Sequence, residues 1–301
     1  MDQRVCIVTG GTRGLGWAAV QMLAEQGHTV IAASRHPEAA QPAIDALVHR
    51  GVSGAVQAMP LDLGSAASVR SFAAECQSRF GRLDVLINNA GVITRNRERT
   101  QDGHERQFGV NHLGHFLLTR ELMPMLAERA DPRVVIVSSA MHRAGEIAWD
   151  DLNLEHGYGM IRAYAQSKLA NVMFAVELAR RAPALSVNAL HPGGVTTGIL
   201  REAPLMRALA WPFSKRPATA ARAVIRLATD PTLAGVSGRY FEGMKETRPA
   251  PAARDAASAG RLWGISEALT ELPRQKSSVS KAPAAVSTPG DANTAIAAAG
   301  S

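Results

Sequence analysis

Short apolar runs rich in β-branched residues alternate with amphipathic stretches along the chain. Runs of this length are typical of strands that are buried on both faces of a parallel sheet. They occupy residues 4–8, 28–33, 56–59, 83–87, 133–137 and 186–190. The stretches between them have helical spacing, and we expect helices from the first glycine turn to about residue 26, from Ser65, over 101–128 and over 162–181. The pattern predicts an α/β fold with a doubly wound parallel sheet of about seven strands and helices on both faces, in three α/β/α layers.

The composition is that of an ordinary globular protein, with 46% hydrophobic and 20% charged residues among 301. We expect a single domain over residues 1–274. Residues 275–301 are dominated by Ala, Ser, Pro and Gly and lack aromatic side chains, which predicts a disordered tail. The two cysteines, Cys6 and Cys76, provide neither a disulfide framework nor a metal cluster.

The two cysteines and the start of the chain favour a cytoplasmic protein, and the charge bears on its partners. Residues 1–4 lead directly into a core strand, which leaves no room for a signal peptide or an anchor. No apolar run approaches the roughly 18 residues that a membrane span needs. The formal net charge of +7 comes from arginines that are scattered without forming a basic block. We therefore expect no nucleic-acid partner and no membrane partner.

A glycine-rich turn follows the first strand. The run Thr9-Gly10-Gly11-Thr12-Arg13-Gly14-Leu15-Gly16 lies between this strand and an amphipathic helix. A strand, a glycine turn and a helix together present backbone N–H groups and a helix N-terminus to a pyrophosphate, which makes the predicted sheet Rossmann-like. Gly10 allows the tight turn, Gly14 the approach of a phosphate and Gly16 close packing of helix on strand.

The second strand ends in Ser34-Arg35, where NAD-binding proteins carry an acidic residue for the ribose hydroxyls. Arg35 at this place and Arg13 in the glycine turn could together hold a 2′-phosphate. Either arginine alone is more often a surface residue. The pair favours NADP(H) as the cofactor over NAD(H).

Two further strand ends carry polar or small residues. Asp62 follows the third strand and could accept a hydrogen bond from an adenine amino group, or it could be a loop or N-cap residue for the helix from Ser65. The fourth strand runs into Asn88-Asn89-Ala90-Gly91. Small residues at a strand end suit a backbone that lies against a flat cofactor, and asparagine side chains can hold such a turn.

A tyrosine and a lysine lie four residues apart in the helix over 162–181. Tyr164 and Lys168 therefore share one helix face, and the cation is expected to lower the pKa of the phenol toward neutrality. Such a pair could act as a general acid or base. The alternative is a solvated polar face. Ser139 ends the fifth strand, so it is expected at the same carboxyl edge of the sheet as the glycine turn.

These residues together resemble the short-chain dehydrogenase/reductase family, in its single-domain branch. The matching motifs, in the order and spacing of that family over 4–272, are Thr9-Gly10-x-x-x-Gly14-x-Gly16, Asn88-Asn89-Ala90-Gly91, Asn111, Ser139, Tyr164-x-x-x-Lys168 and Pro192-Gly193-x-x-x-Thr197. A narrower likeness, to the retinol-dehydrogenase-type subgroup, lies in residues 110–118, 139–171, 238–241 and 262–267.

The resemblance implies an oxidoreductase that transfers a hydride between a nicotinamide and a carbonyl or alcohol group. Tyr164 would exchange the substrate proton, Ser139 would bind the carbonyl oxygen, Lys168 would hold the nicotinamide ribose, and Asn111 would position a water that links Lys168 to solvent. Ser138 would be structural. The implied cofactor-binding residues are Gly10, Thr12, Arg13, Gly14, Leu15, Gly16, Arg35, Asp62, Leu63, Asn89, Ala90, Gly91, Tyr164, Lys168, Pro192, Gly193, Val195 and Thr197.

Two segments are expected to form the substrate pocket, namely 140–160 and 198–216. The second is dense in apolar side chains and indicates a hydrophobic lid, with an oligomer face as the alternative. The substrate is therefore expected to be a small apolar carbonyl or alcohol. A homodimer or homotetramer is also expected, because the Tyr164 helix carries further apolar positions at Val172, Phe174, Ala175 and Leu178.

Other functions remain open. A catalytically silent NADP(H)-binding sensor or scaffold would use the same fold, although every catalytic group is present here. A sugar-nucleotide epimerase or dehydratase would need another glycine spacing and a larger C-terminal substrate domain. The histidines near the site, His112, His115, His142 and His191, lack paired carboxylates, so no catalytic metal is expected.

Overall fold

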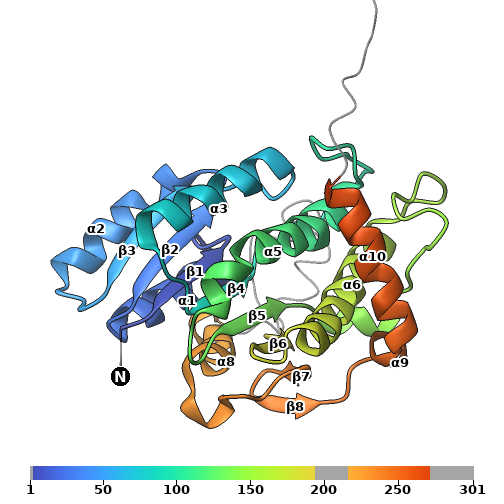
Figure 1. The fold of residues 1–301 in the computed structure, drawn as a ribbon. Coiled ribbons are helices and arrows are strands. Elements are labelled where there is room, and N and C mark those ends of the chain that lie inside the picture. Colours follow the sequence, from blue (N-terminus) through green and yellow to red (C-terminus); the bar gives the residue numbers. More distant parts are fainter. Residues whose placement is uncertain (1–2, 194–215, 272–301) are drawn as a thin grey trace, which may run out of the picture.

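The computed structural model describes residues 3–193 and 216–271 of the chain. They form one eight-stranded sheet with the strand order β3-β2-β1-β4-β5-β6-β7-β8 (Figure 1). The strands are β1 (Val5–Thr9), β2 (Thr29–Ser34), β3 (Ala55–Pro60), β4 (Val85–Asn88), β5 (Arg133–Val137), β6 (Ser186–His191), β7 (Arg239–Glu242) and β8 (Lys245–Thr247). Seven strands are parallel, and the short β8 pairs antiparallel with β7. The predicted doubly wound parallel sheet is confirmed.

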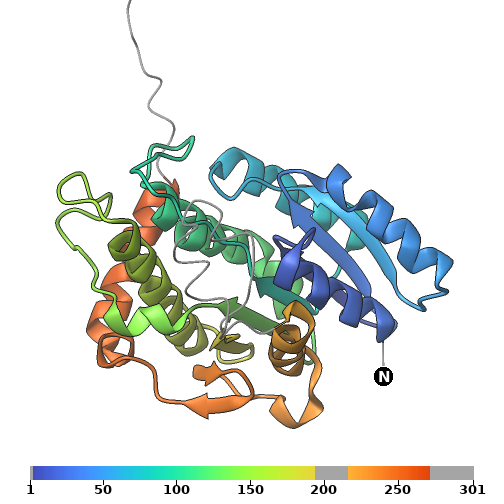
Figure 2. The ribbon, with the colours of Figure 1, turned by 180° about the vertical axis from the view of Figure 1, so that it is seen from behind.

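Helices cover both faces of this sheet, in three layers. Helices α1 and α8 pack together on one face, while α3, α5 and α6 lie on the other (Figures 1 and 2). The described helices are α1 (Gly14–Glu25), α2 (Gln41–His49), α3 (Ala66–Phe80), α4 (Arg106–Phe108), α5 (Gly114–Ala127), α6 (Met160–Arg181), α8 (Pro217–Thr229), α9 (Pro251–Arg254) and α10 (Ala256–Glu271).

The continuous apolar strands follow from burial on both faces. In β5, Val134 and Ile136 join the core beneath α5 and α6, whereas Val135 and Val137 join the core beneath α1 and α8. Successive side chains of a strand point to opposite faces, so a strand between two helix layers must be apolar at every position. Each of these four side chains is buried.

The helix expected over 101–128 begins later and is interrupted. Residues 101–105 form a turn, and the buried carboxylate of Glu105 accepts hydrogen bonds from the N–H groups of Gln107 (2.8 Å) and Phe108 (2.7 Å) at the start of α4. A π-helical turn over Gly109–Leu113 then separates α4 from α5. Turns of this kind are frequent at functional sites, and this one contains Asn111.

Helix α10 lies along α6 on the outside of the molecule (Figure 1). The ring of Trp263 packs edge-on against Phe116 (centroids 4.9 Å apart) and lies 6.0 Å from the ring of Phe174. As a result, the apolar positions expected to face a partner subunit are at most 3% exposed: Val172, Phe174, Ala175 and Leu178. That basis for a dimer is wrong, because the chain covers these side chains itself.

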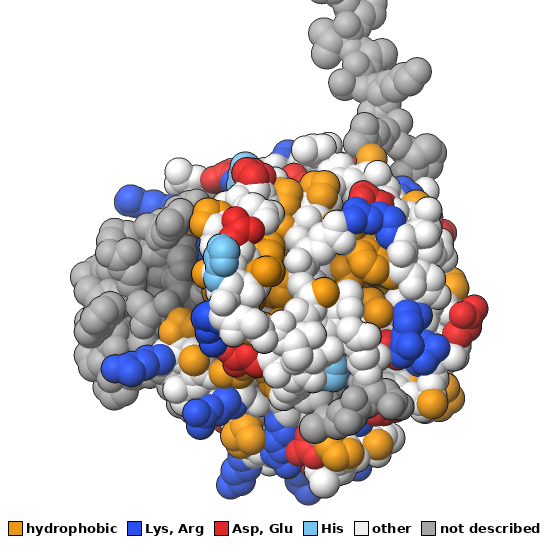
Figure 3. Space-filling view, turned by 90° about the vertical axis from the view of Figure 1, so that its left-hand side faces the viewer, with side chains coloured by type: hydrophobic (Ala, Val, Ile, Leu, Met, Phe, Trp, Pro, Cys, Tyr) orange, Lys and Arg blue, Asp and Glu red, His pale blue; other side chains and the backbone are white. Residues whose placement is uncertain are grey.

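The surface charges are dispersed. On the face drawn in Figure 3, lysine and arginine side chains lie in separate groups among acidic and apolar ones. Several arginines are paired on their own helix or with a neighbouring one, as Arg79 is with Glu75 (2.6 Å) and Arg120 with Glu267 (3.4 Å). A net positive charge therefore does not create a basic block on this face.

Candidate active site

The candidate residues gather at the carboxyl edge of the sheet. Thr9, Asn88 and Val137 are the last residues of the parallel strands β1, β4 and β5, so the segments that follow them lie side by side. Ligands of doubly wound sheets bind at this edge, where the helices on the two faces diverge.

The turn between β1 and α1 is shaped by glycines. Gly10 has φ +63°, a conformation that side chains other than glycine rarely adopt. A Cβ on Gly16 would lie 2.2 Å from the Gly10 carbonyl oxygen, so only glycine allows α1 to pack this closely. Helix α1 begins at Gly14 and has no acidic residue in its first turn. Its N-terminus can therefore accept an anionic group such as a pyrophosphate.

Two arginines lie beside this turn. Arg13 precedes α1 and Arg35 follows β2, and both are exposed. The Gly11 N–H donates to the Ala33 carbonyl (3.3 Å), which ties the turn to the end of β2. Within the described residues, neither arginine has a side-chain hydrogen bond or an ion pair. Both cations are thus available to a phosphate at this place.

Asp62 lies in the loop between β3 and α3. Its Oδ1 accepts a hydrogen bond from the Gly64 N–H (2.9 Å), whereas Ser65 caps α3. The loop interpretation is therefore confirmed, and the adenine contact stays a prediction. The side chains of Leu15 and Leu63 are buried in the two cores, so a cofactor could reach only the backbone of these two residues.

Thr9 and Asn89 join the glycine turn to the end of β4. The Thr9 hydroxyl accepts hydrogen bonds from the N–H groups of Asn89 and Ala90, both at 2.9 Å. The Asn89 side-chain amide donates to the Thr9 carbonyl (2.8 Å). These bonds hold the Asn88–Gly91 turn beside the glycine turn, as predicted for Asn89, whereas the Asn88 side chain donates to Thr119 on α5 (2.9 Å).

The side chains of Ser139 and Tyr164 are neighbours, and the Ser139 hydroxyl acts to lower the pKa of the tyrosine. Ser139 caps the short helix over Ala140–Ala144, where its hydroxyl accepts from the Met141 N–H (3.3 Å). Ser138 is structural, since its hydroxyl donates to the Lys168 carbonyl (2.7 Å). The structure therefore brings together the two hydroxyls that the sequence assigned to substrate.

Lys168 is buried behind the tyrosine. Its Nζ donates to the Val137 carbonyl (3.1 Å) and lies 5.6 Å from the centroid of the Tyr164 ring. Burial lowers the pKa of Lys168 to about 8. Desolvation raises the pKa of Tyr164 to about 12, and the neighbouring Ser139 side chain opposes this rise only in part. The expected lowering of the tyrosine pKa is wrong for this arrangement, because desolvation of the phenol is the largest effect on it.

Asn111 uses its side chain to hold the neighbouring backbone. Its Oδ1 accepts from the Val92 N–H (2.8 Å), and its Nδ2 donates to the Val92 carbonyl (3.1 Å) and to the Ser167 hydroxyl (3.0 Å). A water would therefore have to bind the main-chain carbonyl of Asn111 and not its side chain. The proposed water link stays a prediction.

The remaining expected residues lie near or beyond the end of the described part. Pro192 is buried and Gly193 has φ +97° just after β6. Val195, Thr197, the lid segment 198–215 and the tail lie outside the described residues. Of the other pocket segment, 140–160, the side chains of Ile147 and Leu154 are buried in the core, so they do not line an open pocket.

Sequence reasoning missed the roles of two histidines. His115 contacts Asn111 and Thr9, and His142 contacts Ser139. Their positions four residues after Asn111 and three after Ser139 were the only available signal, because helical spacing brings such residues close together.

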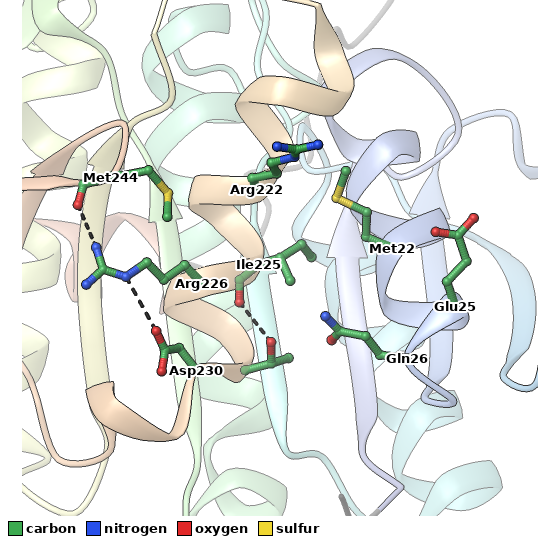
Figure 4. A pocket seen from close by; sticks show the side chains of 9 residues that line it. Met22, Glu25, Gln26, Arg222, Ile225, Arg226, Asp230 and Met244 are labelled. Atoms are coloured by element: carbon green, nitrogen blue, oxygen red, sulfur yellow. Dashed lines mark hydrogen bonds and ion pairs between the residues drawn. The ribbon is translucent and has the colours of Figure 1, made fainter.

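A separate groove of about 500 Å³ lies between α1 and α8 (Figure 4). It is flanked by Arg226, which pairs with Asp230 (3.5 Å) and donates to the Met244 carbonyl (2.5 Å). None of its lining residues is a candidate catalytic or cofactor-binding residue.

The sheet, the glycine turn and the Ser139–Tyr164–Lys168 cluster define a dinucleotide-dependent oxidoreductase fold. The family model for short chain dehydrogenases matches residues 4–208, and the chain belongs to this family, whose members act on CH–OH and C=O groups with a nicotinamide cofactor. The chain is 42% identical to human retinol dehydrogenase 14, over 90% of this chain and 88% of that protein.

The chain is also similar to two other proteins, in sequence and in structure. Polyprenol dehydrogenase from Mus musculus is 40% identical over 89% of this chain and 84% of its own length. The crystal structure of an uncharacterised protein from Mycobacterium paratuberculosis has a TM-score of 0.72 and 35% identity, covering 90% of this chain and 95% of that one. The chain is thus an enzyme of the retinol-dehydrogenase-type subgroup.

Proposed function

We propose that this enzyme transfers a hydride between NADP(H) and the carbonyl or alcohol group of a small apolar substrate, with Tyr164 as the general acid and base. The observation that carries the proposal is the neighbouring pair of Ser139 and Tyr164 side chains, with Lys168 buried behind it, beside a turn that can hold a pyrophosphate. The bound cofactor supplies the hydride, and the protein supplies placement and proton transfer.

The protein groups have complementary tasks in this scheme. The Ser139 hydroxyl binds the carbonyl oxygen, and the Tyr164 hydroxyl donates its proton to that oxygen as the alcohol forms. A pKa of about 12 keeps the phenol protonated at neutral pH, which suits this direction. Lys168 returns a proton to Tyr164 and takes one up from solvent through the water at Asn111, which together form the proton relay. Lys168 also holds the nicotinamide ribose.

The cofactor preference rests on charge. Arg13 and Arg35 are exposed beside the glycine turn, and β2 ends in Ser34 without an acidic residue. A 2′-phosphate would form charge-assisted hydrogen bonds with these guanidinium groups. NAD(H), which lacks this phosphate, would leave both arginines without an anionic partner at this site.

The substrate class rests on the apolar composition of 198–216 and on the relatives, whose names refer to retinol and polyprenol, both apolar alcohols. The same proposal places the catalytic domain in 1–274, in the cytoplasm, with a small-molecule substrate and no nucleic-acid partner. Among the described helices, none is long and apolar enough to cross a membrane. A homodimer or homotetramer stays a prediction that needs a surface other than the covered face of α6.

The test is a screen of apolar aldehydes and ketones, with oxidation of NADPH and of NADH followed by absorbance, and of apolar alcohols in reverse. The wild type should consume NADPH with at least one carbonyl compound. Tyr240→Phe serves as the control for Tyr164→Phe, in which the proposed general acid is lost. The Tyr240 hydroxyl is also buried, and it has no hydrogen-bond partner among the described residues. NADPH binding without turnover of any compound would contradict the proposal and favour a silent sensor.

A further inference from the structure

Two buried histidines contact the main-chain carbonyls of candidate catalytic residues. The Nδ1 atom of His115 lies 2.9 Å from the Asn111 carbonyl oxygen, and the Nδ1 atom of His142 lies 2.8 Å from that of Ser139. A carbonyl oxygen can only accept, so each ring must carry its hydrogen on Nδ1. Both side chains are at most 1% exposed.

The far nitrogen of each ring contacts a different part of the chain. His115 Nε2 lies 2.8 Å from the Thr9 hydroxyl and must accept from it, since the ring hydrogen is on Nδ1; the Ile87 carbonyl is a more distant alternative acceptor for this hydroxyl (3.4 Å). His142 Nε2 accepts from the Ala250 N–H (3.1 Å), just before α9. Each imidazole thus joins a candidate catalytic residue to a segment far away in the sequence.

Burial keeps both rings neutral at physiological pH. It lowers the pKa of His115 to about 4, with the charge of Lys168 acting in the same direction, and it also lowers the pKa of His142. Only a neutral ring has one nitrogen that donates and one that accepts, as both sets of partners require.

We infer that His115 and His142 are positioning residues, which fix the Asn111 and Ser139 backbones by bridging them to Thr9 and Ala250 with neutral Nδ1–H rings. This inference rests on the proposed function of Asn111 and Ser139. Through Thr9, His115 makes the Asn111 end of the proton relay and the Asn89–Ala90 turn a single connected unit. Through Ala250, His142 anchors the strand end that carries the Ser139 hydroxyl.

A third buried histidine provides a matched control. His28 is 1% exposed and lies before β2, at the amino edge of the sheet. Its Nδ1 accepts from the Arg4 N–H (3.3 Å), so its hydrogen is on Nε2 when neutral. His28 therefore has similar burial and the opposite tautomer, and within the described part of the chain it has no hydrogen bond to a candidate site residue.

The first measurement is the histidine tautomer, by ¹⁵N NMR of the full-length protein labelled at histidine, at pH 7. His115 and His142 should show the Nδ1–H form and His28 the Nε2–H form, with each resonance assigned by its loss in the His→Leu variant. An Nε2–H form at His115 or His142 would overturn the inference for that residue. This readout does not depend on activity, so it stands even if no substrate is found.

The second measurement is kinetic, with whichever carbonyl compound the screen identifies. His115→Leu and His142→Leu should each lower kcat by about tenfold or more, since small displacements of catalytic groups have effects of this size or larger. KM for the substrate should change by less than threefold. Asparagine at either position retains a donor toward the carbonyl and should recover part of the lost kcat.

His28→Leu should reduce thermal stability to a similar extent while leaving kcat within twofold of wild type. If all three leucine variants lose kcat only in proportion to their lost stability, the two histidines are merely structural and the inference is wrong. If the wild type turns over no carbonyl compound, the proposed function fails, and the tautomers still decide the bridging geometry.

Discussion

The two edges of the sheet are built from different chemistry. At the amino edge, Asp84 accepts hydrogen bonds from Arg82 (2.8 Å), Arg129 (2.9 Å) and the Val5 N–H (2.8 Å), and Asp131 pairs with Arg4 and the buried Arg133. At the carboxyl edge, the segments after β1, β4 and β5 are held mainly by hydroxyl groups, amides and neutral histidines. The charged side chains that stabilise the fold at the amino edge are therefore paired with one another.

The difference leaves the functional edge free for an anionic ligand. Arg13 and Arg35 lie there without a carboxylate partner in the described part of the chain, whereas arginines at the amino edge are bound by aspartates. A carboxylate placed beside Arg13 and Arg35 would neutralise these arginines and repel a phosphate. Neutral hydrogen bonds can order the backbone there without opposing the cofactor.

Tyr164→Phe should have the largest effect on the carboxyl edge. Loss of the hydroxyl removes the general acid, and kcat should fall by about 10³-fold. NADPH affinity, measured by fluorescence titration, should stay within threefold of wild type. Substantial remaining turnover would mean that another group protonates the product.

Asp84→Ala should instead break the amino edge. It leaves two arginines and the Val5 N–H without their acceptor at an 8% exposed side chain, so the free energy of unfolding should fall by about 3 kcal/mol in urea titrations. The kcat of the folded enzyme should not change. Asp45→Ala, at an exposed position of α2, is the control and should change stability by less than about 0.5 kcal/mol.

The stability contributed by His115 at the carboxyl edge and by the aspartates at the amino edge should be lost in different pH windows. The pKa of His115 is about 4 in the folded chain and about 6.5 when unfolded, so the unfolded state binds more protons and stability falls as the pH drops from 6.5 toward 4. His115 alone should contribute about 2 kcal/mol of this loss between pH 6.5 and pH 5. His115→Leu should therefore flatten the curve of unfolding free energy against pH in this window.

The aspartates respond in a lower window. Their arginine partners hold the pKa values of Asp84 and Asp131 below 3.8, so the stability they contribute is present above that pH and is lost as the pH falls below it. Asp84→Ala should change the slope between pH 6.5 and pH 5 less than His115→Leu does, since Asp84 acts in this window only through its charge on His28. If His115→Leu and Asp84→Ala changed the slope of unfolding free energy against pH equally, the two edges would not have separate pH windows.

Arg35→Asp should have the smallest effect of these changes. It removes one cation from the proposed phosphate site and adds a ribose acceptor, so the ratio of kcat/KM for NADPH to that for NADH should fall by about tenfold. Arg79→Asp makes the same charge change on α3 and should leave the ratio unaltered. An unchanged ratio in Arg35→Asp would contradict the assignment of Arg35 to the phosphate.

Much of the fold could be predicted because its signals are local. The short apolar runs predicted the six strands from β1 to β6, and the glycine turn predicted the start of α1. The interruption at residues 101–113 was not predictable, because the cap by Glu105 and the π-helical turn depend on contacts made after folding. The same is true of α10, whose Trp263 covers a face of α6 that amphipathic spacing left open.

The sequence by itself determined which residues could carry the chemistry: glycines at a strand end, Tyr164 and Lys168 on one helix face, Ser139 after a buried strand. Only the tertiary structure decided their environment. Desolvation set the pKa of Tyr164 opposite to the expected direction, and the ammonium of Lys168 found a partner in the Val137 carbonyl. His115 and His142 acquired partners from distant segments. Residue types and spacing fix local geometry, whereas desolvation and long-range hydrogen bonds exist only once the chain has packed.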